Sequence, residues 1–326
     1  MPRQFRGIGL DKWNVSSVED FSYLFKSTKT FNEPGIATWD TSSATSLQGT
    51  FMDAEAFDQP LYGWDTSHVV DFSKVFLEAT SFDHDLDDAW NVTSGKNFSM
   101  AFANTGAFDH PLKDWNLENA ESLHGMFMNS QAFNQDLPWD TSNIQDFGEM
   151  FLGAQAFNRD VEFDLRSATN IQRMFMNTKV FNSDVSAMNT SLITDFTSVF
   201  NGAEAFSKPV DWDLQSATTL KWMFALSQNF NQPLTLDTTN VEDFSFMFYG
   251  AEKFNSKLNF TSIEAGDDFS GMFAESKAFT QSLCDWGDDI DLLAKVNRMF
   301  TRSKCPSTDN PDLSIDPVSP LCRVCT

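Results

Sequence analysis

Large apolar residues recur along this chain at a nearly fixed interval, and most of them are phenylalanine. One Phe, called position 0 here, occurs twelve times at intervals of 24 to 27 residues, and in nine repeats it closes the motif xxMF or xxVF. A second Phe follows at position +6 in eleven repeats, an apolar residue precedes at −4, and Trp stands at −12 in seven repeats. The pattern indicates one structural unit of about 25 residues, repeated through nearly the whole chain. The residues at position 0 are Phe25, Phe51, Phe76, Phe102, Phe127, Phe151, Phe175, Phe200, Phe224, Phe248, Phe273 and Phe300.

Small and polar residues also keep fixed places in the repeat. Position +3 holds only Ala, Ser or Thr, which predicts close contact between neighbouring repeats at this position. The residue after the Trp position is Asp or Asn in ten of the twelve repeats. Because Asx side chains accept hydrogen bonds from the backbone two residues further on, this column predicts a turn in every repeat.

These columns predict a repeat solenoid similar to leucine-rich-repeat proteins, because a single 25-residue coil buries its apolar face only against its neighbours. Each coil is expected to hold one short parallel strand through the apolar +10 site and another through positions −7 to −4. The segment MFxxA or VFxGA is expected to form one helical or 3-10 turn. The predicted organisation is a poor N-terminal cap or remnant over residues 1–12, the solenoid over 13–300, and a C-terminal cap or tail over 301–326.

Two segments carry a resemblance to a known family. WDTSNIQDFGEMFLGAQAFNRDV (Trp139–Val161) and LDTTNVEDFSFMFYGAEKFNSKL (Leu236–Leu258) resemble the repeat of the BspA-like leucine-rich-repeat surface proteins. The resemblance extends from about Trp13 to Phe300, with Phe in several repeats where that family has its first Met. It implies an exposed protein that serves adhesion or the recognition of other proteins, and it implies no catalytic residues.

The net charge of the chain limits the classes of partner that it is expected to bind. It has 22 Lys and Arg against 46 Asp and Glu, which gives a formal net charge of −24. Nucleic-acid binding requires clustered cations, so no nucleic-acid partner is expected. An anionic membrane would repel a chain of this charge, and no apolar stretch approaches the length of a membrane span, so no direct membrane insertion is expected.

The repeat columns account for almost all of the phenylalanines. Of the 34 Phe, only Phe5 and Phe246 lie outside these columns.

The sequence offers little for catalysis or for a cofactor. The histidines His68, His84, His110 and His124 lie in four different repeats, and a structural role is favoured for all of them. The motifs of phosphate-binding loops, zinc proteases and serine hydrolases are missing. No enzyme activity, catalytic residue, metal site or cofactor is therefore predicted.

Two weaker alternatives come from the polar residues. Acidic runs (83–88, 267–268 and 288–291) suggest weak calcium binding, but they lack the spacing of known calcium loops, and solvated loops are favoured. A column of Thr beside the Trp suggests ice binding. Val92, Leu117, Leu165 and Leu214 interrupt this column between Thr41, Thr66 and Thr141, which argues against a regular array.

All four cysteines lie near the C-terminus, where the repeat pattern fails. Two disulfides among Cys284, Cys305, Cys322 and Cys325 would fasten the tail over the last coil as a cap, and three pairings are possible. A metal site or a redox Cys322–Cys325 pair is the alternative reading.

Further features bear on location. Sequons for N-glycosylation begin at Asn14, Asn91, Asn97, Asn189 and Asn259. No signal peptide precedes the first repeat, so the chain is interpreted as a fragment of a longer protein, or as an intracellular protein capped only by residues 1–10. Together with the resemblance, the sequence favours an extracellular or cell-surface location.

The preferred function is a non-enzymatic scaffold for protein or glycan recognition, with an unknown partner. Its binding face is expected at repeat positions whose residue type varies while the neighbouring positions keep theirs. The alternative function is a structural wall or matrix component that associates with itself end to end. The expected face consists of position +4 (Lys29, Glu55, Gln131, Gln155, Lys179, Glu204) and position +8 (Gln59, His84, His110, Gln135, Arg159).

Overall fold

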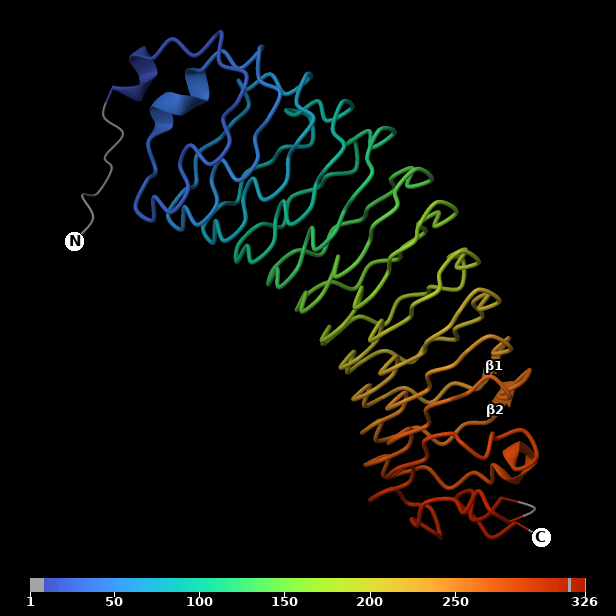
Figure 1. The fold of residues 1–326 in the computed structure, drawn as a ribbon. Coiled ribbons are helices and arrows are strands. Elements are labelled where there is room, and N and C mark those ends of the chain that lie inside the picture. Colours follow the sequence, from blue (N-terminus) through green and yellow to red (C-terminus); the bar gives the residue numbers. More distant parts are fainter. Residues whose placement is uncertain (1–8, 316–317, 326) are drawn as a thin grey trace. The chain divides into compact units, whose positions relative to one another are not determined.

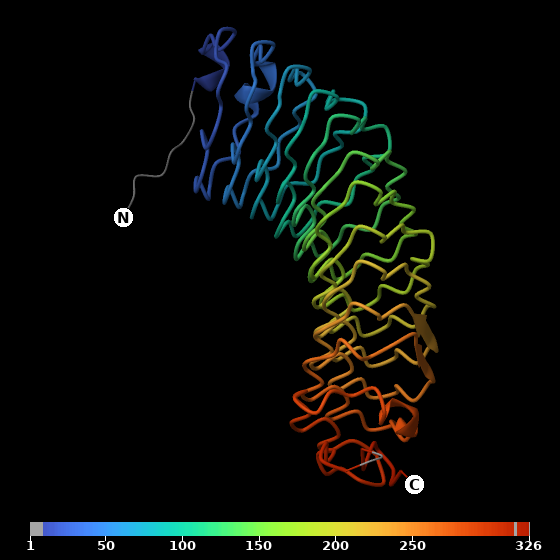
Figure 2. The ribbon, with the colours of Figure 1, turned by 45° about the vertical axis from the view of Figure 1, so that its right-hand side comes forward.

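The computed structural model describes residues 9–315 and 318–325, and the chain divides into two compact units, Met1–Ser167 and Ala168–Thr326. Within each unit the repeats lie side by side in chain order (Figures 1 and 2). The repeated sequence motif is therefore a repeated structural unit. Phe5 and most of the predicted N-terminal segment 1–12 lie outside the described residues.

Neighbouring repeats are joined by parallel bridges at position −5. Each bridge is a single residue pair, because the chain turns at a positive φ three residues later. The second strand predicted for positions −7 to −4 is thus reduced to one bridging residue in each repeat. The bridged residues are, in order, Asp20, Ser46, Asp71, Asn97, Ser122 and Asp146 in the first unit, and Asp195, Thr219, Asp243, Asp268 and Lys295 in the second.

The segment around position 0 is a run of turns, so the predicted helical turn is wrong. Tyr23 and Ser27, at positions −2 and +2 of the first repeat, both have a φ of 58°. The backbone N–H groups of Tyr23 and Phe25 donate to the next repeat, whereas that of Leu24 donates three residues back, to Phe21. A helix requires every amide to bond within its own segment, and here alternate amides bond to the neighbouring repeat instead.

Regular elements are few among the described residues. Strands β1 (Leu234–Leu236) and β2 (Leu258–Phe260) pair in parallel, with Leu234 opposite Leu258. They confirm the predicted strand at +10 in two repeats only. Three 3-10 helices, η1 (Leu10–Lys12), η2 (Pro34–Thr38) and η3 (Cys284–Trp286), lie away from position 0.

The core of each unit consists of stacked Phe rings. The ring of Phe127 lies 3.9 Å from that of Phe133 in its own repeat and 5.8 Å from that of Phe151 in the next, measured between centroids. All three side chains are fully buried. The stack explains why the chain uses an aromatic ring where other repeat proteins use Leu: flat rings fill the narrow layer between repeats and attract one another through offset stacking.

Two further columns fasten each repeat locally. The indole N–H of Trp64 donates to the backbone oxygen of Ile36 in the preceding repeat at 2.9 Å, and that of Trp139 donates to Leu112 in the same way. The predicted Asx turn is confirmed: the Asp65 carboxylate accepts the N–H of Ser67, two residues on, at 2.9 Å. The Ser67 hydroxyl also donates to Asp65, and this hydrogen bond lowers the pKa of the carboxyl group.

Candidate functional site

The proposed binding columns differ in what their side chains do. At position +4, Lys29, Gln131, Lys179 and Glu204 are exposed. Glu55 is exposed as well and accepts a hydrogen bond from Lys29 at 2.6 Å, which raises the pKa of the lysine. Gln155 is partly buried and donates to the backbone oxygen of Gly153. Position +4 therefore presents mainly exposed polar groups, and two of them, Lys29 and Glu55, pair with each other.

Position +8 is occupied by hydrogen-bond donors that join one repeat to the next. All five proposed residues are partly buried. Gln135 donates to the backbone oxygen of Asp109 at 2.9 Å, and Arg159 donates to that of Asn134 at 2.7 Å. The remaining three, Gln59, His84 and His110, contact Asn32, Asp58 and Asp83 of the preceding repeat in the same manner. The residue type varies at this position, but the ability to donate is kept.

A ladder at position +7, which the sequence analysis did not identify, lies beside these donors. The Asn32 side-chain oxygen accepts the backbone N–H of Asp58 at 2.9 Å, and Asp109 accepts that of Asn134 at 2.8 Å. In the second unit Asn231 accepts the N–H of Asn255. The signal for this ladder is the Asn or Asp that follows the second Phe in most repeats.

The Thr column beside the Trp faces the interior. Thr41, Thr66 and Thr141 are at most 1% exposed, and their hydroxyls donate to backbone oxygens of the next repeat. A buried hydroxyl column presents nothing to an ice surface. The weak ice-binding alternative is therefore contradicted by the burial of its own residues.

The four histidines lie in separate repeats, and each contacts polar groups of its own surroundings. His124 lies 3.4 Å from Asp146, and the hydrogen bond between them raises the pKa of His124, while partial burial opposes the change. His68 contacts the hydroxyl of Ser67, which itself donates to Asp65. In a nucleophilic triad the carboxylate bonds the imidazole and the imidazole accepts the serine proton, so this order is the wrong one for activating Ser67.

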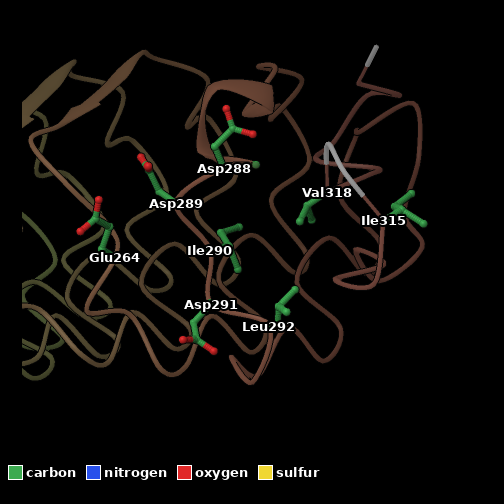
Figure 3. A pocket seen from close by; sticks show the side chains of 9 residues that line it. Glu264, Asp288, Asp289, Ile290, Asp291, Leu292, Ile315 and Val318 are labelled. Atoms are coloured by element: carbon green, nitrogen blue, oxygen red, sulfur yellow. The ribbon is translucent and has the colours of Figure 1, made fainter.

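The acidic run at 288–291 lines a cavity of about 470 Å³ near the C-terminal tail. Asp288, Asp289 and Asp291 come from one loop, and Figure 3 shows their carboxylates pointing in different directions, with Glu264 on a separate segment. Calcium requires six to eight oxygen ligands directed at one point. Among the described residues, no group of three metal-ligating side chains converges.

The C-terminal tail is fastened by two disulfides, Cys284–Cys325 and Cys305–Cys322. Of the three pairings left open by the sequence, the structure contains this one. Leu321 of the tail is fully buried, and its backbone oxygen accepts the N–H of Leu283 in the last repeat at 3.3 Å. The tail therefore covers apolar residues at the end of the second unit.

The sequons differ in accessibility. Asn14, Asn91, Asn189 and Asn259 are exposed. Asn97 is partly buried, and its side-chain oxygen accepts both the N–H and the hydroxyl of Ser99. Four of the five acceptors are therefore open to modification.

Comparison with known proteins identifies one family. The model of a family described as "Mycoplasma protein of unknown function, DUF285" matches residues 2–112, 96–211 and 209–312. Three tandem matches agree with the repeat architecture and are consistent with a BspA-like repeat. No curated protein and no solved structure matches the chain. None of the helices that the structure describes has the length and apolar character needed to cross a membrane.

Proposed function

We propose that this chain, which belongs to the DUF285 family, is a non-enzymatic recognition scaffold. It is built as a leucine-rich-repeat-like solenoid of about twelve coils, is displayed at the cell surface or secreted, and binds a protein or glycan partner. Because the family description assigns no activity, the proposal depends on the surface of the chain and on the resemblance to BspA-like proteins.

The contrast between positions +4 and +8 carries this proposal. Both columns vary in residue type, but the side chains at +8 are engaged with the preceding repeat, whereas most of those at +4 extend into solvent. Variation at solvent-exposed positions, repeated along a rigid core, is what an extended recognition surface requires. We therefore assign the binding face to position +4. The side chains at position +8 have a structural role, because they join each repeat to the preceding one.

Two features support an extracellular location. Disulfides persist in oxidising compartments and are rare in the reducing cytosol, and this chain contains two of them. Exposed sequons agree with passage through a secretory pathway. The acidic surface suits partners that are not themselves strongly acidic over large areas.

The proposal is tested by binding to arrays of extracellular proteins and glycans. The wild-type chain is compared with a variant carrying Ala at the exposed +4 residues Lys29, Glu55, Gln131, Lys179 and Glu204. A control variant carries Ala at the exposed position −6 residues Glu19, Glu121 and Glu242. Loss of binding in the first variant alone supports the proposal. Failure of the wild-type chain to bind any array component, or substrate turnover by the purified chain, would contradict it.

Self-association is the second candidate, and one residue favours it. The Trp13 side chain is 54% exposed and stacks on Trp39, whereas Trp39 itself is 3% exposed. An open indole at the edge of a stack offers a surface to a second copy. The C-terminal tail presents no corresponding open indole, so pairing through Trp13 would give dimers instead of long chains. Light scattering over a range of concentrations distinguishes a monomer, a dimer and a longer chain. Trp13→Ala is the variant expected to abolish association.

A further inference from the structure

One aromatic cluster on the surface of the second unit lies outside the core columns. Phe246, which the repeat pattern does not account for, occupies position −2, and Trp222 occupies the same position one repeat earlier. Their rings stack with centroids 4.3 Å apart, and Tyr249 meets the Phe246 ring edge-on. All three side chains are only partly buried. The cluster is therefore a solvent-facing stack of rings.

The stack stops at Gly271, and a cavity begins there. Gly271 holds position −2 in the next repeat, where a Cβ atom would lie 2.5 Å from the Phe246 ring. The repeat after it places Arg298 at the same position. A cavity of about 480 Å³ is lined by Phe246, Gly271 and Arg298, together with Tyr249, Ala274, Glu275, Thr301 and Arg302. One face of the Phe246 ring is covered by Trp222, and the ring also lines the cavity.

Two arginines, Arg298 and Arg302, line this cavity in a protein of net charge −24. Lys295 and Lys304 lie close to them in the sequence, and all four cations are exposed. Arg302 pairs with Glu275 at 3.0 Å, and Lys295 pairs with Asp268. Among the described residues, the guanidinium of Arg298 has neither a hydrogen-bond nor an ion-pair partner. At physiological salt, charges more than about 8 Å away are largely screened, so the local cations determine which ions this cavity attracts.

We infer that this cavity, the Phe246–Arg298 cleft, binds an acidic sugar unit of a glycan. A pyranose ring held in this cavity would lie against the Phe246 ring, which is part of its lining. The C–H groups on one face of a pyranose carry partial positive charge and are attracted to the negative face of an aromatic ring. A uronic-acid carboxylate accepts paired hydrogen bonds from Arg298, and guanidinium suits this planar geometry better than an ammonium does.

The polar rim of the cleft favours a sugar over a peptide side chain. Thr301, Arg302, Glu275 and Tyr249 line the cavity together with the Phe246 ring. Such donors and acceptors match sugar hydroxyls, whereas an apolar side chain of a peptide gains most in an enclosed apolar pocket. The inference rests on the proposed recognition function and names one chemical class of partner for it.

The test is calorimetric titration of the full chain with a galacturonic-acid oligosaccharide. Saturable binding is expected, weakened roughly tenfold or more by Phe246→Ala and by Arg298→Ala because each variant removes one of the two principal contacts. Tyr23→Ala and Lys74→Ala, at position −2 of the first unit, are the matched controls and should leave the affinity unchanged. Circular dichroism melting of each variant checks that its fold is intact.

Several results would overturn the inference. These are absence of saturable binding, binding that Phe246→Ala and Arg298→Ala leave unchanged, and equal binding of a neutral galactose oligosaccharide that is insensitive to Arg298→Ala. Competition by polyglutamate at equal concentration would also overturn it in favour of an acidic peptide. A chain that still binds its array partner through position +4 but binds no acidic sugar would refute this inference and leave the recognition function standing.

Discussion

The carboxylate of Asp109 accepts the backbone N–H of Asn134, 25 residues further along the chain, at 2.8 Å. The same carboxylate accepts a hydrogen bond from the Gln135 side chain at 2.9 Å. One side chain thus receives both the main chain and a side chain of the next repeat. This arrangement makes position +7 a fastening between neighbouring repeats.

Replacing Asp109 by Ala should destabilise the first unit by about 1 kcal/mol, because two hydrogen bonds at a solvent-exposed site lose their acceptor. Urea denaturation followed by tryptophan fluorescence measures the change. Asp109→Asn is the matched control, since it removes the same charge but keeps an acceptor, as Asn32 does in the first repeat. Equal loss in both variants would show that charge matters and that the ladder does not.

The stacked Phe column should be far more sensitive. Phe127→Ala is expected to cost about 3–5 kcal/mol, since the ring is fully buried and leaves a cavity between three neighbouring rings. Phe127→Leu should cost clearly less because it keeps much of the apolar volume. Thermal denaturation of the two variants measures the difference. A Phe127→Leu variant as unstable as Phe127→Ala would instead indicate that ring stacking, and not volume, holds the layer together.

His124 should make the stability of the first unit depend on pH. The hydrogen bond that His124 donates to the Asp146 carboxylate raises the pKa of His124 above 6.5, against the opposing effect of burial. A pKa raised in the folded state gives stability that is fully present below pH 6.5 and is lost as the pH rises through the folded-state value.

Denaturation midpoints on both sides of pH 6.5 test this dependence. The stability advantage of the wild type over His124→Gln should be largest at the acidic side and should shrink toward alkaline pH. Gln is a suitable replacement because Gln48 occupies the same position three repeats earlier in the chain. A constant difference at all pH values would contradict the assignment.

The two disulfides should stabilise the second unit unequally. Removing the Cys284–Cys325 pair as a double Ser variant should cost about 2–5 kcal/mol, and removing Cys305–Cys322 should cost less, because its closed loop is shorter. The sequence separations are 41 and 17 residues. Calorimetry of the two double variants measures this order. If neither variant changes the melting temperature of the second unit, the tail does not act as a cap.

The columns with one dominant residue type were predictable from the sequence. The Asx turn at Asp65 and the burial of Ala54 at position +3 both follow from side-chain chemistry that one residue fixes locally, and both are found. Their repetition in twelve copies separated them from chance. The burial of the Phe columns was predictable for the same reason.

The run of turns at position 0 was not predictable from apolar spacing. Its cause is the positive φ at positions −2 and +2, where Gly125 and Gly153 occur in some repeats but Lys74 and Asn129 in others. Since non-Gly residues occupy these positions as well, glycine does not identify them in the sequence.

The role of position +8 was not predictable either, because Gln, His and Arg differ in size and charge and share only the ability to donate a hydrogen bond.

The claim that this chain works outside the cell is tested most directly by its intact mass, measured on protein from its native host with and without alkylation and deglycosylation. The account predicts that no cysteine is alkylated before reduction, and that deglycosylation removes mass attached at the exposed sequons. Four alkylated cysteines and an unmodified mass would contradict the proposed surface location, and with it the recognition function that depends on it.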